Sequence, residues 1–153
     1  MVGKKVPDFT LKDQDENTVK LSSFKGQWVV LYFYPKDDTP GCTREAIAFT
    51  EDNPDFRNLD AVILGVSRDS CQSHRKFIVK YNLGITLLSD PDHTVMEKYG
   101  AWGEKTMYGK TTEGTIRSTV LIDPSGIIVH LWPKVTVDGH AEAVKAKLKE
   151  LRG

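Results

Sequence analysis

The sequence predicts an α/β fold in which helices pack against a largely parallel β-sheet. Two short apolar runs, residues 28–34 and 61–66, have no polar alternation, which is typical of strands buried on both faces. Each run precedes a segment with helix-start signals, and this strand–helix–strand order implies parallel strands joined by a right-handed crossover. A chain of 153 residues suits one domain around one core, so we expect residues 1–153 to form a single domain.

The N-terminal segment is predicted to form a β-hairpin ahead of the first buried strand. Short alternating stretches at residues 9–11 and 18–21 flank a polar run from Lys12 to Asn17. Pro35 is expected to end the strand of residues 28–34, because proline cannot donate a hydrogen bond to a neighbouring strand.

Two helices are predicted in the first half of the chain. Thr39 and Pro40 resemble an N-cap followed by proline at the first helical position, and we expect the helix that they begin to end before Pro54. A second helix is expected over residues 69–81, with Asp69 and Gln72 spaced as in a capping box.

The second half is predicted to add two antiparallel strands and two helices to this core. The expected elements are a strand at residues 85–88, a helix at 93–99, a loop at 101–114, a hairpin of strands 118–122 and 127–131, and an amphipathic helix at 141–151. The resulting order, β-β-β-α-β-α-β-α-β-β-α, fits a thioredoxin-like three-layer sandwich with an added N-terminal β-hairpin.

The charge balance gives no sign of a nucleic-acid or membrane partner. Lys plus Arg and Asp plus Glu number 21 each, so the formal net charge is zero. No run approaches the length of a membrane span, and the first residues lack the apolar core of a signal peptide. Two cysteines do not make a disulfide scaffold, so we expect a cytoplasmic, reducing environment.

Neither a metal nor a cofactor is expected. The four histidines, at positions 74, 93, 130 and 140, have no short spacing that groups them with one another or with a cysteine. A glycine-rich dinucleotide motif, a phosphate-binding loop and a serine-hydrolase elbow are also missing from the sequence.

Cys42 is the candidate nucleophile. It falls in the first turn of the helix that begins at Pro40, where backbone N–H groups have no intrahelical partner. These N–H groups and the positive end of the helix dipole favour a thiolate over a thiol. A small buried cysteine that only packs is the alternative, but the neighbouring Pro, Gly and Asp residues indicate a partly open loop and favour a reactive thiol.

This stretch also resembles a known family. Pro35-x-x-x-Thr39-x-x-Cys42 resembles the peroxidatic signature of peroxiredoxins, and residues 34–43 look like the bacterioferritin comigratory protein, or peroxiredoxin Q, class. Residues 87–90, 102–105, 109–110 and 117–123 resemble that class in the same order and spacing. The resemblance implies a thiol-dependent peroxidase that reduces hydrogen peroxide and organic hydroperoxides through a sulfenic acid at Cys42.

Four further residues are candidates for the peroxidase site. The N–H groups of Gly41 and Cys42 can hold an oxygen at the helix terminus, and Thr39 can offer a hydroxyl unless it serves only as the N-cap. The resemblance places the family's catalytic arginine at Arg117, which we prefer over Arg44 and Arg68. Pro35 is expected to shield the sulfur from water. Tyr34 and Glu45 are weaker candidates for supporting roles.

The sulfenic acid must be reduced by a second thiol, and here the sequence departs from its class. The two positions at which family members carry a resolving cysteine are Ile47 and Ile78 in this chain. Cys71 is the only other cysteine, and it follows a strand parallel to that of Cys42, so we expect both cysteines to border one crevice. We nevertheless expect Cys71 to be dispensable and an external thiol to act in its place.

The expected partners follow from this chemistry: a peroxide substrate and a reductant such as thioredoxin, glutaredoxin or a small thiol. The protein is expected to be a monomer or weak homodimer. An alternative function is a thioredoxin-like redox sensor or binding module whose Cys42 oxidises without efficient turnover. A thiol–disulfide oxidoreductase is disfavoured because no C-x-x-C motif is present.

Overall fold

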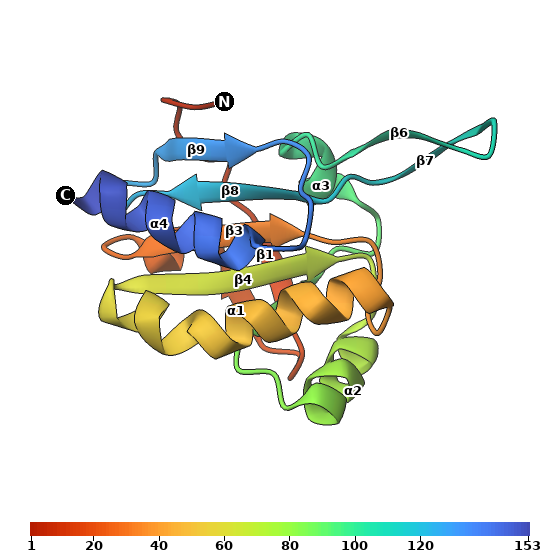
Figure 1. Ribbon diagram of the computed structural model, residues 1–153, viewed down its shortest axis with the longest axis horizontal. Coiled ribbons are helices and arrows are strands. Elements are labelled where there is room, and N and C mark those ends of the chain that lie inside the picture. The colour runs from red at the N-terminus through yellow and green to blue at the C-terminus, as the bar shows by residue number, and fades with distance from the viewer.

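The computed structural model describes the backbone of residues 1–153 and the side chains of residues 1–106 and 108–153. Its centre is a seven-stranded sheet in the order β2-β1-β5-β4-β3-β8-β9 (Figure 1). The strands are β1 (Thr10–Asp13), β2 (Thr18–Lys20), β3 (Trp28–Phe33), β4 (Ala61–Ser67), β5 (Thr86–Ser89), β8 (Ser118–Ile122) and β9 (Ile128–Trp132).

Helices cover the two faces of this sheet and complete three layers. Buried side chains of α1 (Pro40–Asn58), α2 (Cys71–Tyr81) and α4 (His140–Arg152) pack on one face. The short 3-10 helix η1 (Leu21–Phe24) and α3 (Thr94–Lys98) pack on the other face. The α/β sandwich and the N-terminal hairpin predicted from the sequence are therefore both present. Among the described residues, no helix combines the length and the apolar character that crossing a bilayer requires.

The central pairing explains why the site forms at one edge of the sheet. β3 and β4 are parallel, as predicted, so their carboxyl ends lie at the same edge. β8 runs antiparallel to β3, with Ser118 opposite Phe33. The residue that precedes β8 is therefore brought beside the loop that follows β3.

The predicted end of the first helix was wrong, because α1 continues through Pro54 to Asn58. Proline removes one intrahelical hydrogen bond, but Pro54 lies on the exposed side of α1, where water can satisfy the freed carbonyl. On the opposite side, Phe49 and Phe56 are fully buried and hold both halves of the helix against the sheet.

The segment predicted as a loop at residues 101–114 is instead a two-stranded ribbon. β6 (Trp102–Met107) pairs with β7 (Lys110–Thr115) through a tight turn. Tyr108 and Gly109 both have positive φ, as a two-residue hairpin turn of this kind requires. The ribbon projects away from the main sheet (Figure 1), so it needs few apolar residues to form. The alternation of apolar and polar residues that would indicate strands is therefore weak in this segment.

The predicted capping box of the second helix was also wrong. α2 begins at Cys71, and its N-cap is Ser70, whose side chain accepts a hydrogen bond from the N–H of Ser73. Asp69 is used elsewhere: its carboxylate accepts hydrogen bonds from the Ser67 hydroxyl and from the backbone N–H of Asp37.

Candidate active site

Cys42 lies in the first turn of α1, as predicted, but its environment is more closed than the sequence suggested. The residue is 2% exposed and packs in the core layer beneath α1 and α4. Thr39 has the extended backbone of an N-cap and Pro40 is the first helical residue. The first intrahelical bond runs from the N–H of Thr43 to the carbonyl of Thr39, so the N–H groups of Gly41 and Cys42 precede it.

Arg117 is the charged residue that contacts the Cys42 sulfur. Its Nη2 donates a hydrogen bond to Cys42 Sγ at 3.2 Å, and its Nη1 donates to Glu45 Oε1 at 2.6 Å. The side chain of Arg117 is only 18% exposed. A partly buried guanidinium held at this distance is placed to stabilise negative charge at the sulfur or on an oxygen bound beside it.

The other two arginines considered from the sequence lie elsewhere. Arg44 pairs with Asp138 at the surface. Arg68 donates to the carbonyl of Pro91 and lies over the ring of Trp102. The preference for Arg117 therefore agrees with the geometry.

Gly41 gives the guanidinium room to approach the helix terminus. A Cβ atom at this position would lie 3.3 Å from Arg117 Nη2 and 3.9 Å from a methyl group of Val137. An alanine there would press against Nη2, so the guanidinium would have to shift by a few tenths of an ångström. Glycine is thus favoured here by the packing of the site.

Glu45 is buried one helical turn after Cys42 and pairs with the guanidinium of Arg117. Burial raises the pKa of Glu45 to about 7, and the charge of Arg117 and its hydrogen bond only partly oppose this effect. Burial acts to lower the pKa of Arg117, but the negative charges of Glu45 and Cys42 outweigh it and raise that pKa, so Arg117 stays charged. One carboxylate oxygen, Oε2, is buried without a hydrogen-bond partner among the described residues.

Thr39 and Pro35 line the loop ahead of the helix, and both are half-buried. The Thr39 hydroxyl donates to the carbonyl of Lys36 at 2.8 Å and makes no capping hydrogen bond to α1. Capping by the Thr39 side chain, the alternative weighed from the sequence, is therefore not observed. The oxygen lone pairs of Thr39 remain available, while its proton is directed to Lys36.

Lys105 belongs to the charge environment of the site, and sequence reasoning missed it. It lies on β6, in the segment that was expected to be a loop. Burial and the charge of Arg117 lower the pKa of Lys105, whereas the charge of Cys42 raises it. The ribbon therefore brings a second cation near the sulfur.

Cys71 lies at the first position of α2, beside the N-terminal hairpin. It lines a hollow together with Leu11, Lys12 and Glu16 of the N-terminal hairpin. Cys42 contacts Arg117, the residue that precedes β8. In the sheet order, β5, β4 and β3 lie between β8 and β1, the strand beside Cys71. The expectation that both cysteines border one crevice was therefore wrong. Burial and the charge of Glu16 raise the pKa of Cys71.

Comparison with known proteins places this geometry in a family. The model of the AhpC/TSA family matches residues 2–131. The chain belongs to this family. It is 48% identical to a putative peroxiredoxin bcp of Coxiella burnetii, over 96% of this chain and 97% of the relative. It is 47% identical to the peroxiredoxin Bcp of Bacillus subtilis, over 98% of this chain and 96% of the relative. The chain is thus a peroxiredoxin, a thiol-dependent peroxidase.

Solved structures of this class have the same fold. The bacterioferritin comigratory protein of Xanthomonas campestris superposes with a TM-score of 0.91 at 43% identity, covering 95% of this chain and 92% of that one. A mutant PrxQ of Xylella fastidiosa superposes with a TM-score of 0.95 at 39% identity, covering 100% and 98%. The prediction of a thioredoxin-like fold is confirmed, as is the resemblance to the peroxiredoxin Q class.

Proposed function

We propose that this peroxiredoxin uses Cys42 as its peroxidatic nucleophile. The observation that supports this most strongly is the 3.2 Å contact between Arg117 Nη2 and Cys42 Sγ, with the same guanidinium held by Glu45. Arg117 is thereby fixed before substrate arrives, so its charge needs no reorganisation during the reaction.

In the first step the Cys42 thiolate attacks one oxygen of the peroxide. A sulfur–oxygen bond forms and the O–O bond breaks; sulfur gives up two electrons, and the departing alkoxide or hydroxide takes a proton to become an alcohol or water. Arg117 and the N–H groups of Gly41 and Cys42 stabilise the negative charge of the departing oxygen. Thr39 orients the peroxide through its hydroxyl, and Pro35 limits the access of water.

In the second step an external thiol reduces the sulfenic acid. Its sulfur bonds to Cys42 and water leaves; a second thiol then releases Cys42 and carries away a disulfide. Cys71 is a poor candidate for this step, because its raised pKa leaves little thiolate and it lies on the β1 side of the sheet. Thioredoxin, glutaredoxin or a small thiol of a reducing cytoplasm would serve, and a monomer or weak homodimer suffices for this cycle.

The proposed substrates are hydrogen peroxide and organic hydroperoxides. The study of the Xanthomonas campestris relative concerned its alkyl peroxide reduction activity, and this chain is 43% identical in sequence to that protein.

The experiment that tests the proposal identifies the oxidised atom. One equivalent of hydrogen peroxide or of an alkyl hydroperoxide is added to the reduced protein with a dione probe that traps sulfenic acids, and the labelled peptide is found by mass. The proposal predicts a label on Cys42 with both peroxides. Labelling confined to Cys71 would overturn it.

A further inference from the structure

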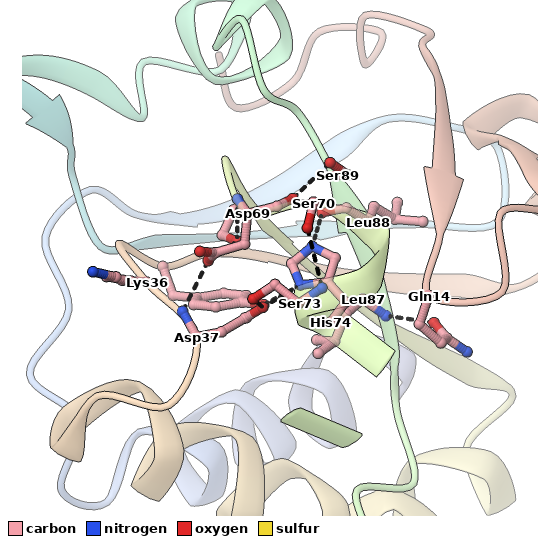
Figure 2. Close-up of polar contacts among 12 residues, drawn as sticks. Gln14, Lys36, Asp37, Asp69, Ser70, Ser73, His74, Leu87, Leu88 and Ser89 are labelled. Atoms are coloured by element: carbon pink, nitrogen blue, oxygen red, sulfur yellow. Dashed lines mark hydrogen bonds and ion pairs between the residues drawn. The ribbon is translucent and has the colours of Figure 1, made fainter. Parts of the chain in front are cut away.

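The loop that joins β3 to the peroxidatic helix is fastened to α2 by a buried polar network (Figure 2). Its centre is Asp37, which is 7% exposed. Asp37 accepts hydrogen bonds from the Tyr34 hydroxyl at 2.6 Å and the Ser73 hydroxyl at 2.8 Å, and its carboxylate lies 2.7 Å from Nδ1 of His74. Its own N–H donates to Asp69 Oδ2 at 2.8 Å.

The hydrogen-bond partners of the buried His74 ring fit an imidazolium. The ring is fully buried, with Nε2 at 2.9 Å from the carbonyl oxygen of Leu88 and Nδ1 at 2.7 Å from the carboxylate of Asp37. The Leu88 carbonyl only accepts, so Nε2 carries a proton; with Asp37 ionised, Nδ1 carries a second proton and the ring is an imidazolium. The Tyr34 and Ser73 hydroxyls also donate to Asp37, which supports an ionised carboxylate.

A second attachment, at the surface, joins the same loop to the far end of α2. Asp38, next to Asp37, has a left-handed backbone with φ of 58°. Its carboxylate accepts hydrogen bonds from Lys80 and Tyr81. Residues 73, 74, 77, 80 and 81 share one face of the helix, so α2 presents this face to the loop along its whole length.

The first turn of α1 depends on this loop for its position. The side chain of the N-cap residue Thr39 makes no capping hydrogen bond to α1, and its hydroxyl is directed back to Lys36 within the loop. Asp37 lies two residues before Thr39 and five before Cys42. A change in the path of the loop at Asp37 therefore moves both residues.

We propose that Asp37 and His74 form a buried ion pair that positions Thr39 and the Cys42 thiolate for attack on peroxide. This inference rests on the function proposed above for Cys42. Neither residue touches the sulfur in the described contacts, so both act through the loop. Displacement of a reacting group by about 1 Å is enough to slow a reaction by about a hundredfold.

The test compares variants that break the pair with one that preserves its hydrogen bonds. Asp37→Ala and His74→Phe remove the pair. Asp37→Asn keeps a neutral equivalent, because its amide oxygen can accept from Tyr34 while its NH2 donates to Ser73 and to an unprotonated Nδ1 of His74. Leu148→Ala is the matched control, because it opens a cavity in the fully buried core under α4 but removes none of the polar contacts of Asp37 and His74.

Two quantities are measured on folded protein: the rate of Cys42 oxidation by stopped flow, and hydrogen exchange of the amides of residues 39–43. We expect Asp37→Ala and His74→Phe to slow oxidation by at least about tenfold and to speed exchange. Asp37→Asn should stay near the wild-type rate, and Leu148→Ala should leave it unchanged. Wild-type rates in the two breaking variants, or equal slowing in Leu148→Ala, would overturn the inference.

A further measurement applies even if the breaking variants fail to fold. The 15N spectrum of the wild-type histidine rings should show both nitrogens of His74 protonated, and one unprotonated nitrogen would overturn the ion pair. Whether Cys42 reacts at all is tested separately by Cys42→Ser, so failure of the proposed function is distinguishable from failure of this inference.

Discussion

Arg117 Nη2 lies 3.2 Å from Cys42 Sγ, and the opposite nitrogen of the same guanidinium lies 2.6 Å from Glu45 Oε1. The pairing of Ser118 with Phe33 across β8 and β3 produces this relationship, because it carries the preceding arginine to the end of β3. Glu45, one turn along α1 from Cys42, fixes the other end of the guanidinium. The planar side chain thus bridges two residues of one helix.

Loss of the guanidinium should slow peroxide attack. Arg117→Ala removes the donor to the sulfur and the charge that stabilises the departing oxygen, so we expect a decrease of roughly a hundredfold in the rate of Cys42 oxidation. Arg117→Lys keeps the charge but not the two-pronged geometry and should fall between alanine and wild type. Thiolate absorbance measures how much of Cys42 is ionised in each protein, and stopped flow measures the rate of its oxidation. Equal absorbance and rate in all three proteins would show that Arg117 has no part in the chemistry.

Glu45 should make stability depend on pH between about 4.5 and 7. Its pKa is about 7 in the fold and near 4.5 in the unfolded chain, so in this range the folded state holds a proton that the unfolded state releases. The free energy of unfolding should therefore fall as pH rises through this window, by roughly 2 to 4 kcal/mol in total.

The matched variant for this test is Glu45→Gln, which retains the shape of the side chain and does not titrate. Urea unfolding of both proteins at several pH values gives the difference in unfolding free energy. We expect the wild type to lose stability relative to Glu45→Gln from pH 4.5 to pH 7. Parallel profiles for the two proteins would contradict the raised pKa of Glu45.

Thr39 should matter for rate more than for stability. Its hydroxyl makes no capping bond, so Thr39→Val should cost less than the ~1 kcal/mol typical of a lost N-cap. The same change removes a polar group from the peroxide site and should slow oxidation by about tenfold, while Thr39→Ser keeps most of the rate. Thermal unfolding measures the change in stability of each variant, and stopped flow measures the change in its oxidation rate. A large loss of stability at an unchanged rate would show that the threonine serves the helix instead.

Cys71 should be dispensable for turnover. Cys71→Ser is expected to retain the wild-type rate of peroxide consumption with an external thiol, because Cys71 faces the N-terminal hairpin. Non-reducing digestion after one equivalent of peroxide should give little Cys42–Cys71 linked peptide. If that peptide dominates, and Cys71→Ser leaves Cys42 prone to sulfinic acid, Cys71 is the resolving cysteine.

The sequence was informative wherever burial leaves a continuous apolar pattern. The strands that became β3 and β4 were recognisable because both faces of each are covered, and Thr39-Pro40 marked the start of α1 because proline fits its first position. Arg117 could be selected from its place before an apolar strand and from the family resemblance. These features depend on local chemistry and on the order of elements.

Contacts between distant segments were harder to predict. The ribbon of β6 and β7 has mainly polar strands that pair only with each other, so neither periodicity nor burial revealed it. The dipeptide Tyr108-Gly109 between two stretches of equal length was the available signal. Without the ribbon, Lys105 could not be placed near Cys42. His74 and Asp37 are 37 positions apart, and their contact depends on how α2 docks on the loop.

The most direct test of the central claim is peroxide consumption by folded Cys42→Ser beside the wild type, with a reducing thiol in excess. Serine conserves the volume of the buried side chain but cannot supply the sulfur nucleophile, and circular dichroism establishes that the variant is folded. Our account predicts rapid consumption by the wild type and none above the uncatalysed rate by Cys42→Ser. Consumption by the folded variant at more than about one-hundredth of the wild-type rate, a difference of less than ~3 kcal/mol in activation free energy, would contradict the assignment of Cys42.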